Sequence, residues 1–336
     1  MTVHRRRAKL KQTLVYIDAP QVLLLKARQV TVVALAVRDE NFELPFVAVT
    51  VTPSDWKKYV RGAVDLRYLF EYAQPYTVYM FDLKDIKDGE VMMTPYKKAL
   101  PEKFLPDSRF FVHHHTEDMG GFAAPTDVQT FDIDGKWELN DFSKLYSRYS
   151  DVYSFLLALE KYEDQTAPRD IRRIVVDTFL DQPFKGGFSY VNFFDQLTAA
   201  QNDNERLSIK SMQYASPGTV EVKGSGSAFA DANHAIYSFG ENFKEIMDQY
   251  NKLHDYLSER KYLQMRATDF DNNTAPAAYI INETKSLADL LGLRQWGAIN
   301  TLAKHNALAV AKIVLSYYRR VEHTFAFIAE GRLELL

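Results

Sequence analysis

Short apolar segments separated by polar turns occupy the N-terminal part of the chain. They are rich in β-branched side chains, which is typical of strands, and they cover residues 14–17, 22–26, 30–37 and 46–51. Four short strands joined by short turns predict a small curved antiparallel sheet or an SH3-like barrel. Thr52 and Asp65 have side chains that suit helix N-caps, so each predicts the start of a short helix. A further strand is expected over 76–81.

The middle of the chain mixes two periodicities. Apolar residues spaced for one helical face predict helices over 142–162 and 188–200. Shorter apolar or alternating stretches predict strands over 171–180, 207–213 and 219–223. The expected fold class is therefore α+β, with a compact β-α-β-β module that contains an antiparallel sheet.

A heptad pattern follows this module. From Phe229 to Leu257, apolar residues recur in steps of three and four, which predicts one unbroken helix. Two interpretations stay open for this face. It packs within its own chain, which we favour because His254 is the only flanking residue that can carry a charge, or it forms a subunit interface. The interface would be centred on residues seven apart: Phe229, Ile236, Phe243 and Tyr250.

The C-terminal part predicts further helices. Residues 286–289 fit a capping box, and apolar spacing predicts a helix over 298–330. The expected organisation is a basic tail over 1–12, a β-rich barrel-like domain over 13–135, the α+β module over 136–225, and the long helix with C-terminal helices over 226–336.

Composition excludes several classes of function. The 336 residues include 41 Lys and Arg against 44 Asp and Glu, and the net charge of −3 is not that of a nucleic-acid-coating protein. With no cysteine, disulfide scaffolds, thiolate zinc sites and cysteine nucleophiles are excluded. The longest apolar stretches fall far short of the roughly 20 residues that cross a bilayer. We therefore expect a cytoplasmic protein with no membrane contact and no cofactor.

Three clusters are candidates for binding or chemistry. Imidazoles and a carboxylate at His113, His115 and Glu117 have the chemistry of zinc or manganese ligands, and on a strand the two histidines would share one face. A polar surface or interface strand explains them without a metal, and we favour that interpretation. The second cluster precedes the predicted long helix and consists of Gly224, Ser225, Gly226 and Ser227. Its backbone amides suit the binding of an anion. The alternative is a flexible turn in which Ser227 caps the helix. The third cluster comprises Arg5, Arg6, Arg7, Arg319 and Arg320. These arginines suit contact with nucleic-acid phosphates, or they belong to a solvated tail and a solvated helix face.

Two stretches carry a family resemblance. Residues 207–222 resemble a strand–turn–strand segment of many uncharacterised bacterial proteins. Residues 16–22 and 65–70 are similar to a bacterial β-rich domain of unknown function. Some proteins of this kind occur among phage-defence genes, and the resemblance assigns no catalytic residue.

The resulting hypothesis is a non-catalytic bacterial protein that binds a protein partner or self-assembles, as a sensor or regulator in phage defence. The alternatives are a metal-dependent hydrolase or nuclease that uses the histidine cluster, and a nucleic-acid-binding protein.

Overall fold

The computed structural model describes residues 5–38, 43–72, 78–116, 127–182, 184–185, 187–202 and 205–336. The chain has an α+β fold that divides into two compact units, Met1–Phe122 (unit 1) and Ala123–Leu336 (unit 2). No helix in the described part is long and apolar enough to cross a membrane.

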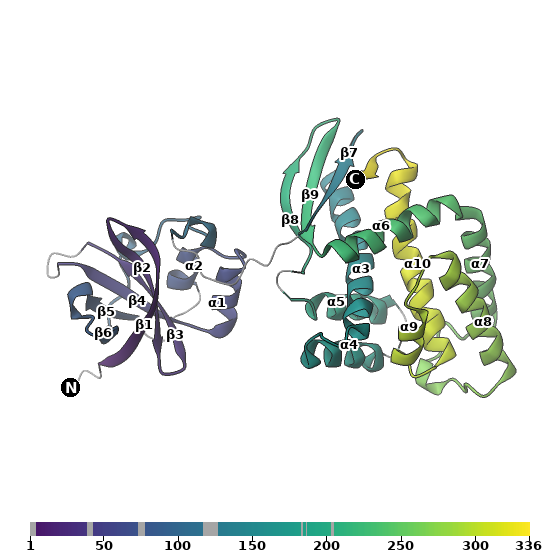
Figure 1. Ribbon diagram of the computed structural model, residues 1–336, viewed down its shortest axis with the longest axis horizontal. Helices are drawn as coiled ribbons and strands as arrows, with labels where there is room; N and C mark the ends of the chain where they lie inside the picture. Colours follow the sequence, from purple (N-terminus) through teal and green to yellow (C-terminus); the bar gives the residue numbers. More distant parts are fainter. Residues whose placement is uncertain are drawn as a thin grey trace. The chain divides into compact units, whose positions relative to one another are not determined.

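Unit 1 is a closed antiparallel barrel (Figure 1). Its six strands are β1 (Arg6–Ile17), β2 (Ala19–Ala27), β3 (Val30–Ala36), β4 (Pro45–Val51), β5 (Val78–Asp82) and β6 (Glu90–Tyr96). Each strand pairs with the next, and β1 pairs with β6 to close the barrel. The N-terminal barrel expected from the apolar segments is confirmed.

Alternation along the strands gives unit 1 two apolar clusters. One cluster has members on all six strands and fills the barrel interior, with Ala34, Ala48 and Met93 among its buried residues. The other lies on the opposite face of the strands. It is covered by α1 (Pro53–Val60) and α2 (Leu66–Glu71), which begin at the predicted caps Thr52 and Asp65.

Unit 2 combines a small sheet with a helical bundle (Figure 1). The antiparallel sheet has the order β10-β7-β9-β8, from β7 (Asp127–Ile133), β8 (Ser208–Gln213), β9 (Gly218–Gly224) and β10 (Leu333–Leu335). The helices are α3 (Leu139–Glu163), α4 (Arg169–Asp181), α5 (Gly187–Ala199), α6 (Gly226–Glu241), α7 (Phe243–Glu259), α8 (Ala275–Leu290), α9 (Trp296–Leu302) and α10 (Ala307–Ala329). Helix α10 is buried on nearly all sides and contacts α3, α6, α7 and α8.

The domain boundaries differ from the sequence prediction. Strand β1 begins at Arg6 and pairs with two neighbours, so residues 6–12 are not a tail. Strand β7 pairs with β9 and β10 and therefore belongs to unit 2 and not to the barrel. The predicted α+β module and the C-terminal helices share one apolar core.

Residues 171–180 are helical, and the predicted strand there is wrong. Ile171, Val175 and Phe179 are buried at intervals of four residues, which places them on one face of α4. The β-branched residues in this stretch favoured a strand, but the spacing of the buried residues is that of a helix.

The heptad pattern does not form one helix. Asn242 adopts φ −112° and ψ 21°, outside helical geometry, and separates α6 from α7. Phe229 and Ile236 are buried in the core of unit 2, which supports packing within the chain over a subunit interface. Phe243, predicted at the centre of the seam, is 42% exposed, because the break changes the direction of the helix face. Tyr250 is half-buried and stacks on Tyr318 with ring centroids 3.9 Å apart.

Two C-terminal predictions are also wrong. Residues 286–289 lie inside α8, whose cap is Thr274, so they start no helix. The helix predicted over 298–330 is interrupted before Asn306, which caps α10 by accepting a hydrogen bond from the amide of Ala309.

Candidate functional site

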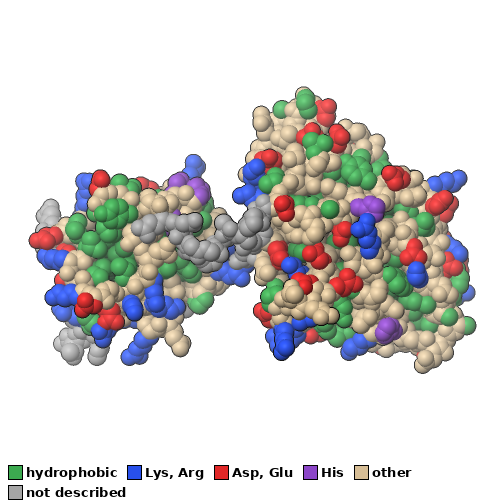
Figure 2. Space-filling model, in the orientation of Figure 1, with side chains coloured by type: hydrophobic (Ala, Val, Ile, Leu, Met, Phe, Trp, Pro, Cys, Tyr) green, Lys and Arg blue, Asp and Glu red, His purple; other side chains and the backbone are tan. Residues whose placement is uncertain are grey.

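An open groove of about 840 Å³ follows β1 on unit 1. Ala8, Tyr79, Glu90 and Met92 line it together with seven cationic residues: Arg5, Arg6, Arg7, Lys9, Lys11, Lys26 and Arg28. We call these eleven residues the basic groove. On the face of unit 1 that Figure 2 presents, Lys and Arg side chains lie around the barrel together with some Asp and Glu side chains.

Strand alternation directs the cations of the basic groove outward. Ala8 is buried in the barrel interior and Leu10 packs against the same interior cluster. Arg7 and Lys9, on either side of Ala8, therefore point outward and are exposed, and Lys11 is exposed at a β-bulge that follows Leu10. Strand β1 thus presents a row of exposed cations.

The neighbouring strand β2 adds a cation to this face. Lys26 lies between Leu25 and Ala27, which both belong to the interior cluster, so its side chain also points outward. In the β1–β2 register Lys26 is directly opposite Lys9. Like charges in this position repel and destabilise a sheet.

Partners within the protein neutralise only part of this charge. Arg7 forms an ion pair with Glu90, and Arg6 donates a 3.4 Å hydrogen bond to the hydroxyl of Tyr79. Lys26 donates a 3.4 Å hydrogen bond to the neutral Thr31 hydroxyl. Neither Lys9 nor Lys26 forms an ion pair with any residue that the structure describes. The groove therefore carries uncompensated positive charge.

The charge of the chain is divided unequally between the units. Residues 1–122 contain 18 Lys and Arg against 15 Asp and Glu, a net charge of +3. The remaining residues contain 23 against 29, a net charge of −6. The net charge of −3 is therefore the sum of a basic unit 1 and an acidic unit 2. Seven of the cations of unit 1 lie in the basic groove.

The histidine cluster does not converge on one point. Residues Val112–His114 form a 3₁₀ turn where a strand was predicted, and the rings of His113 and His114 lie 4.1 Å apart. His115 turns toward the buried Tyr59, whose hydroxyl is 2.7 Å from Nε2. Burial and repulsion by His114 lower the pKa of His115 to about 4.

No metal site forms from the residues that can be placed. Within the described ranges no group of three or more His, Cys, Asp or Glu side chains has an arrangement suited to a metal ion. Glu117, the third predicted ligand, lies outside the described residues.

The predicted anion site at the start of α6 already has protein partners. The amide of Gly226 donates a 3.0 Å hydrogen bond to the Asp127 carboxylate, and the amide of Ser225 donates a 2.7 Å hydrogen bond to the Tyr153 hydroxyl. Ser227 lies inside the helix and donates to Glu160, so it is not the cap. At Gly224 an added Cβ would lie 2.6 Å from the Tyr153 hydroxyl, so this glycine serves close packing. Two carboxylates at this helix terminus disfavour an anion.

The two C-terminal arginines bind protein groups. Arg320 is 6% exposed and its Nε donates a 2.6 Å hydrogen bond to Asp151, while its guanidinium lies 3.6 Å from the Phe194 ring centroid. Arg319 is half-buried, and its Nη1 donates to the Tyr250 hydroxyl at 3.4 Å. Arg320 is therefore unavailable to nucleic acid, whereas Arg5, Arg6 and Arg7 all lie in the basic groove.

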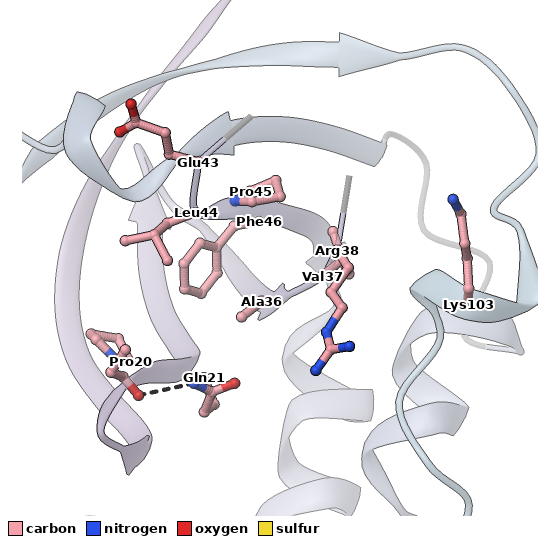
Figure 3. A pocket seen from close by; sticks show the side chains of 11 residues that line it. Pro20, Gln21, Ala36, Val37, Arg38, Glu43, Leu44, Pro45, Phe46 and Lys103 are labelled. Atoms are coloured by element: carbon pink, nitrogen blue, oxygen red, sulfur yellow. Dashed lines mark hydrogen bonds between the residues drawn. The ribbon is translucent and has the colours of Figure 1, made fainter. Parts of the chain in front are cut away.

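A second hollow of about 880 Å³ lies elsewhere on the barrel (Figure 3). Apolar and polar groups both line it, and the Gln21 amide donates a 3.1 Å hydrogen bond to the backbone of Ala19. Figure 3 shows the charged side chains of Glu43 and Lys103 well apart. Its charged lining residues are two cations, Arg38 and Lys103, and one carboxylate, Glu43, so it carries far less excess positive charge than the basic groove.

Sequence reasoning identified the arginines of the groove but missed Lys26 and Arg28. The sequence feature that could have revealed them is the short turn around Asp18, which predicts a hairpin. In such a hairpin the end of the second strand lies beside the start of the first strand, which places Lys26 next to Lys9. Comparison with known proteins gives no further guidance, because no family model, curated protein or solved structure matches the chain.

Proposed function

We propose that unit 1 binds nucleic acid through its phosphate backbone, along the basic groove. The observation that carries this proposal is the excess of seven cations over one carboxylate, with Lys9 and Lys26 directly opposite each other. A phosphate placed between these two ammonium groups would replace repulsion by attraction. Its binding would also release counterions from the nucleic acid, which favours association at low salt.

The composition of the groove supports backbone contact over base recognition. Sequence-specific proteins present side chains that pair with base edges or aromatic rings that stack on exposed bases. Tyr79 is the only aromatic residue that lines the basic groove, and its ring belongs to the barrel interior. We therefore expect binding that depends strongly on salt and weakly on sequence.

This proposal takes up the nucleic-acid-binding alternative of the sequence analysis, in place of the protein partner or self-assembly that the sequence favours. A role as a sensor or regulator in phage defence is a further proposal that rests on the sequence resemblance alone.

Fluorescence anisotropy with a labelled oligonucleotide tests the proposal on the full chain at low salt. The double variant Lys9→Glu/Lys26→Glu should weaken binding by about tenfold or more, because it replaces two phosphate contacts by repulsion. The matched control is Lys57→Glu/Lys98→Glu, which makes the same charge change at exposed positions of unit 1 outside the groove. It should change affinity by less than about threefold.

Three results would overturn the proposal. The wild-type chain does not bind the oligonucleotide at low salt; the two double variants lose the same affinity; or an acidic peptide competes as well as nucleic acid of equal charge. In each variant an unchanged circular dichroism spectrum shows that the fold is intact.

A further inference from the structure

We infer that the nucleic acid bound by the basic groove is an extended single strand that lies along β1, an inference that rests on the proposed function. Three features of the groove point to this ligand: the spacing of its cations on β1, the short distance between β1 and Lys26 on β2, and an exposed apolar side chain beside them.

The cations on β1 have the spacing of an extended backbone. Arg7 and Lys9 are alternate residues on the regular part of the strand and point outward, and the exposed Lys11 follows at a β-bulge between Leu10 and Gln12. Alternate residues of a strand are about 6.6 Å apart. This distance is close to the separation of successive phosphates in an extended polynucleotide, so one row of cations can follow consecutive phosphates.

Lys26, the groove cation on β2, lies too close to the row on β1 to hold the other strand of a duplex. Lys26 on β2 is directly opposite Lys9 on β1, and paired strands are about 4.8 Å apart. The phosphate rows of duplex DNA are separated by a minor groove about 6 Å wide or a major groove about 12 Å wide. Lys9 and Lys26 therefore suit the two sides of a single backbone.

An apolar side chain next to the cations offers a surface to an unstacked base. Met92 on β6 is directly opposite Arg7 on β1 and is 48% exposed. Contact with the face of a base removes apolar area of both groups from water. In a duplex the base faces are already covered by stacking, so only a single strand gains this contact.

The test compares labelled oligothymidylate with a duplex of the same strand length, each titrated with the full chain at the same low salt. We expect the single strand to bind about fivefold tighter or more. Met92→Ala should weaken single-strand binding by about threefold and leave duplex binding unchanged. Met212→Ala is the control, because Met212 is similarly exposed, at 43%, but lies on β8 in unit 2.

The outcomes separate this inference from the proposed function. Equal or tighter binding of the duplex overturns the single-strand inference and leaves nucleic-acid binding standing. An effect of Met92→Ala that is absent, or that is the same for both ligands, also overturns the inference. Failure of the wild-type chain to bind either ligand overturns the inference and the proposed function together.

Discussion

Lys9 on β1 and Lys26 on β2 are directly opposite each other in the barrel, and no described carboxylate pairs with either. A like-charge pair in this position destabilises a sheet by a few tenths of a kcal/mol up to about 1 kcal/mol. The protein alone gains nothing visible from this arrangement. A phosphate bound between the two ammonium groups would replace this repulsion by attraction. A mutation that removes the repulsion should therefore raise the free energy of unfolding and weaken phosphate binding.

The first prediction concerns these opposite effects on stability and binding. Lys26→Glu places a carboxylate opposite Lys9, so it should raise the free energy of unfolding by about 0.2–1 kcal/mol while weakening oligonucleotide binding. Urea denaturation and anisotropy on the same preparation measure both quantities. Lys57→Glu, the control on α1, should change neither appreciably. A variant that is less stable, or that binds as tightly as the wild type, contradicts the interpretation of the pair.

The second prediction concerns pH and His115. Because burial lowers its pKa to about 4, the folded protein binds fewer protons here than the unfolded chain, whose histidine titrates near the ordinary value of 6.5. This contribution to stability is complete above about pH 6.5 and is lost as the pH falls toward 4. NMR titration of the imidazole signals, with His115→Gln for assignment, should show that the His115 signal titrates near pH 4. A His115 signal that titrates near 6.5 would refute the buried environment.

The third prediction concerns the buried ion pair in unit 2. Asp151→Ala leaves the Arg320 guanidinium buried against Phe194 without a counter-ion, and should cost about 3–5 kcal/mol of stability. Asp289→Ala breaks the exposed pair with Lys285, and should cost less than about 1 kcal/mol. Urea denaturation compares the two. Similar losses would show that the Arg320 pair is not the buried contact described here.

The fourth prediction separates two phenylalanines on either side of the break at Asn242. Phe239 is fully buried, and its truncation to alanine should cost about 3–5 kcal/mol. Phe243 is largely outside the core, so Phe243→Ala should cost about 1 kcal/mol or less. Denaturation curves that gave equal losses would restore the unbroken helix that the heptad pattern predicts.

Several elements could be predicted because local signals and tertiary packing agree there. The β-branched segments of the barrel form strands, and Thr52 and Asp65 cap helices through their side chains. Predictions failed where these signals conflict. In α4 the β-branched residues favour a strand, but the core contacts them at helical spacing. At Asn242 the apolar pattern continues although the backbone leaves helical geometry, and no periodicity reveals such a break.

The candidate site could be predicted only in part. The arginines near the N-terminus are visible as a cluster in the sequence, but Lys26 joins them only through the register of β1 and β2. The burial of Arg320 likewise depends on Asp151 and Phe194, which are far from it in the chain. Adjacent charges thus indicate a surface only when the fold leaves them exposed together.

The salt dependence of oligonucleotide binding tests the central claim most directly. For wild-type protein, the logarithm of the affinity should fall linearly with the logarithm of salt concentration, with a slope set by the number of phosphates contacted. Lys9→Gln/Lys26→Gln should make the slope shallower by about 1–2, and the exposed control Lys57→Gln/Lys98→Gln should leave it unchanged. A wild-type slope near zero, or the same slope in all three proteins, would contradict phosphate binding in the basic groove.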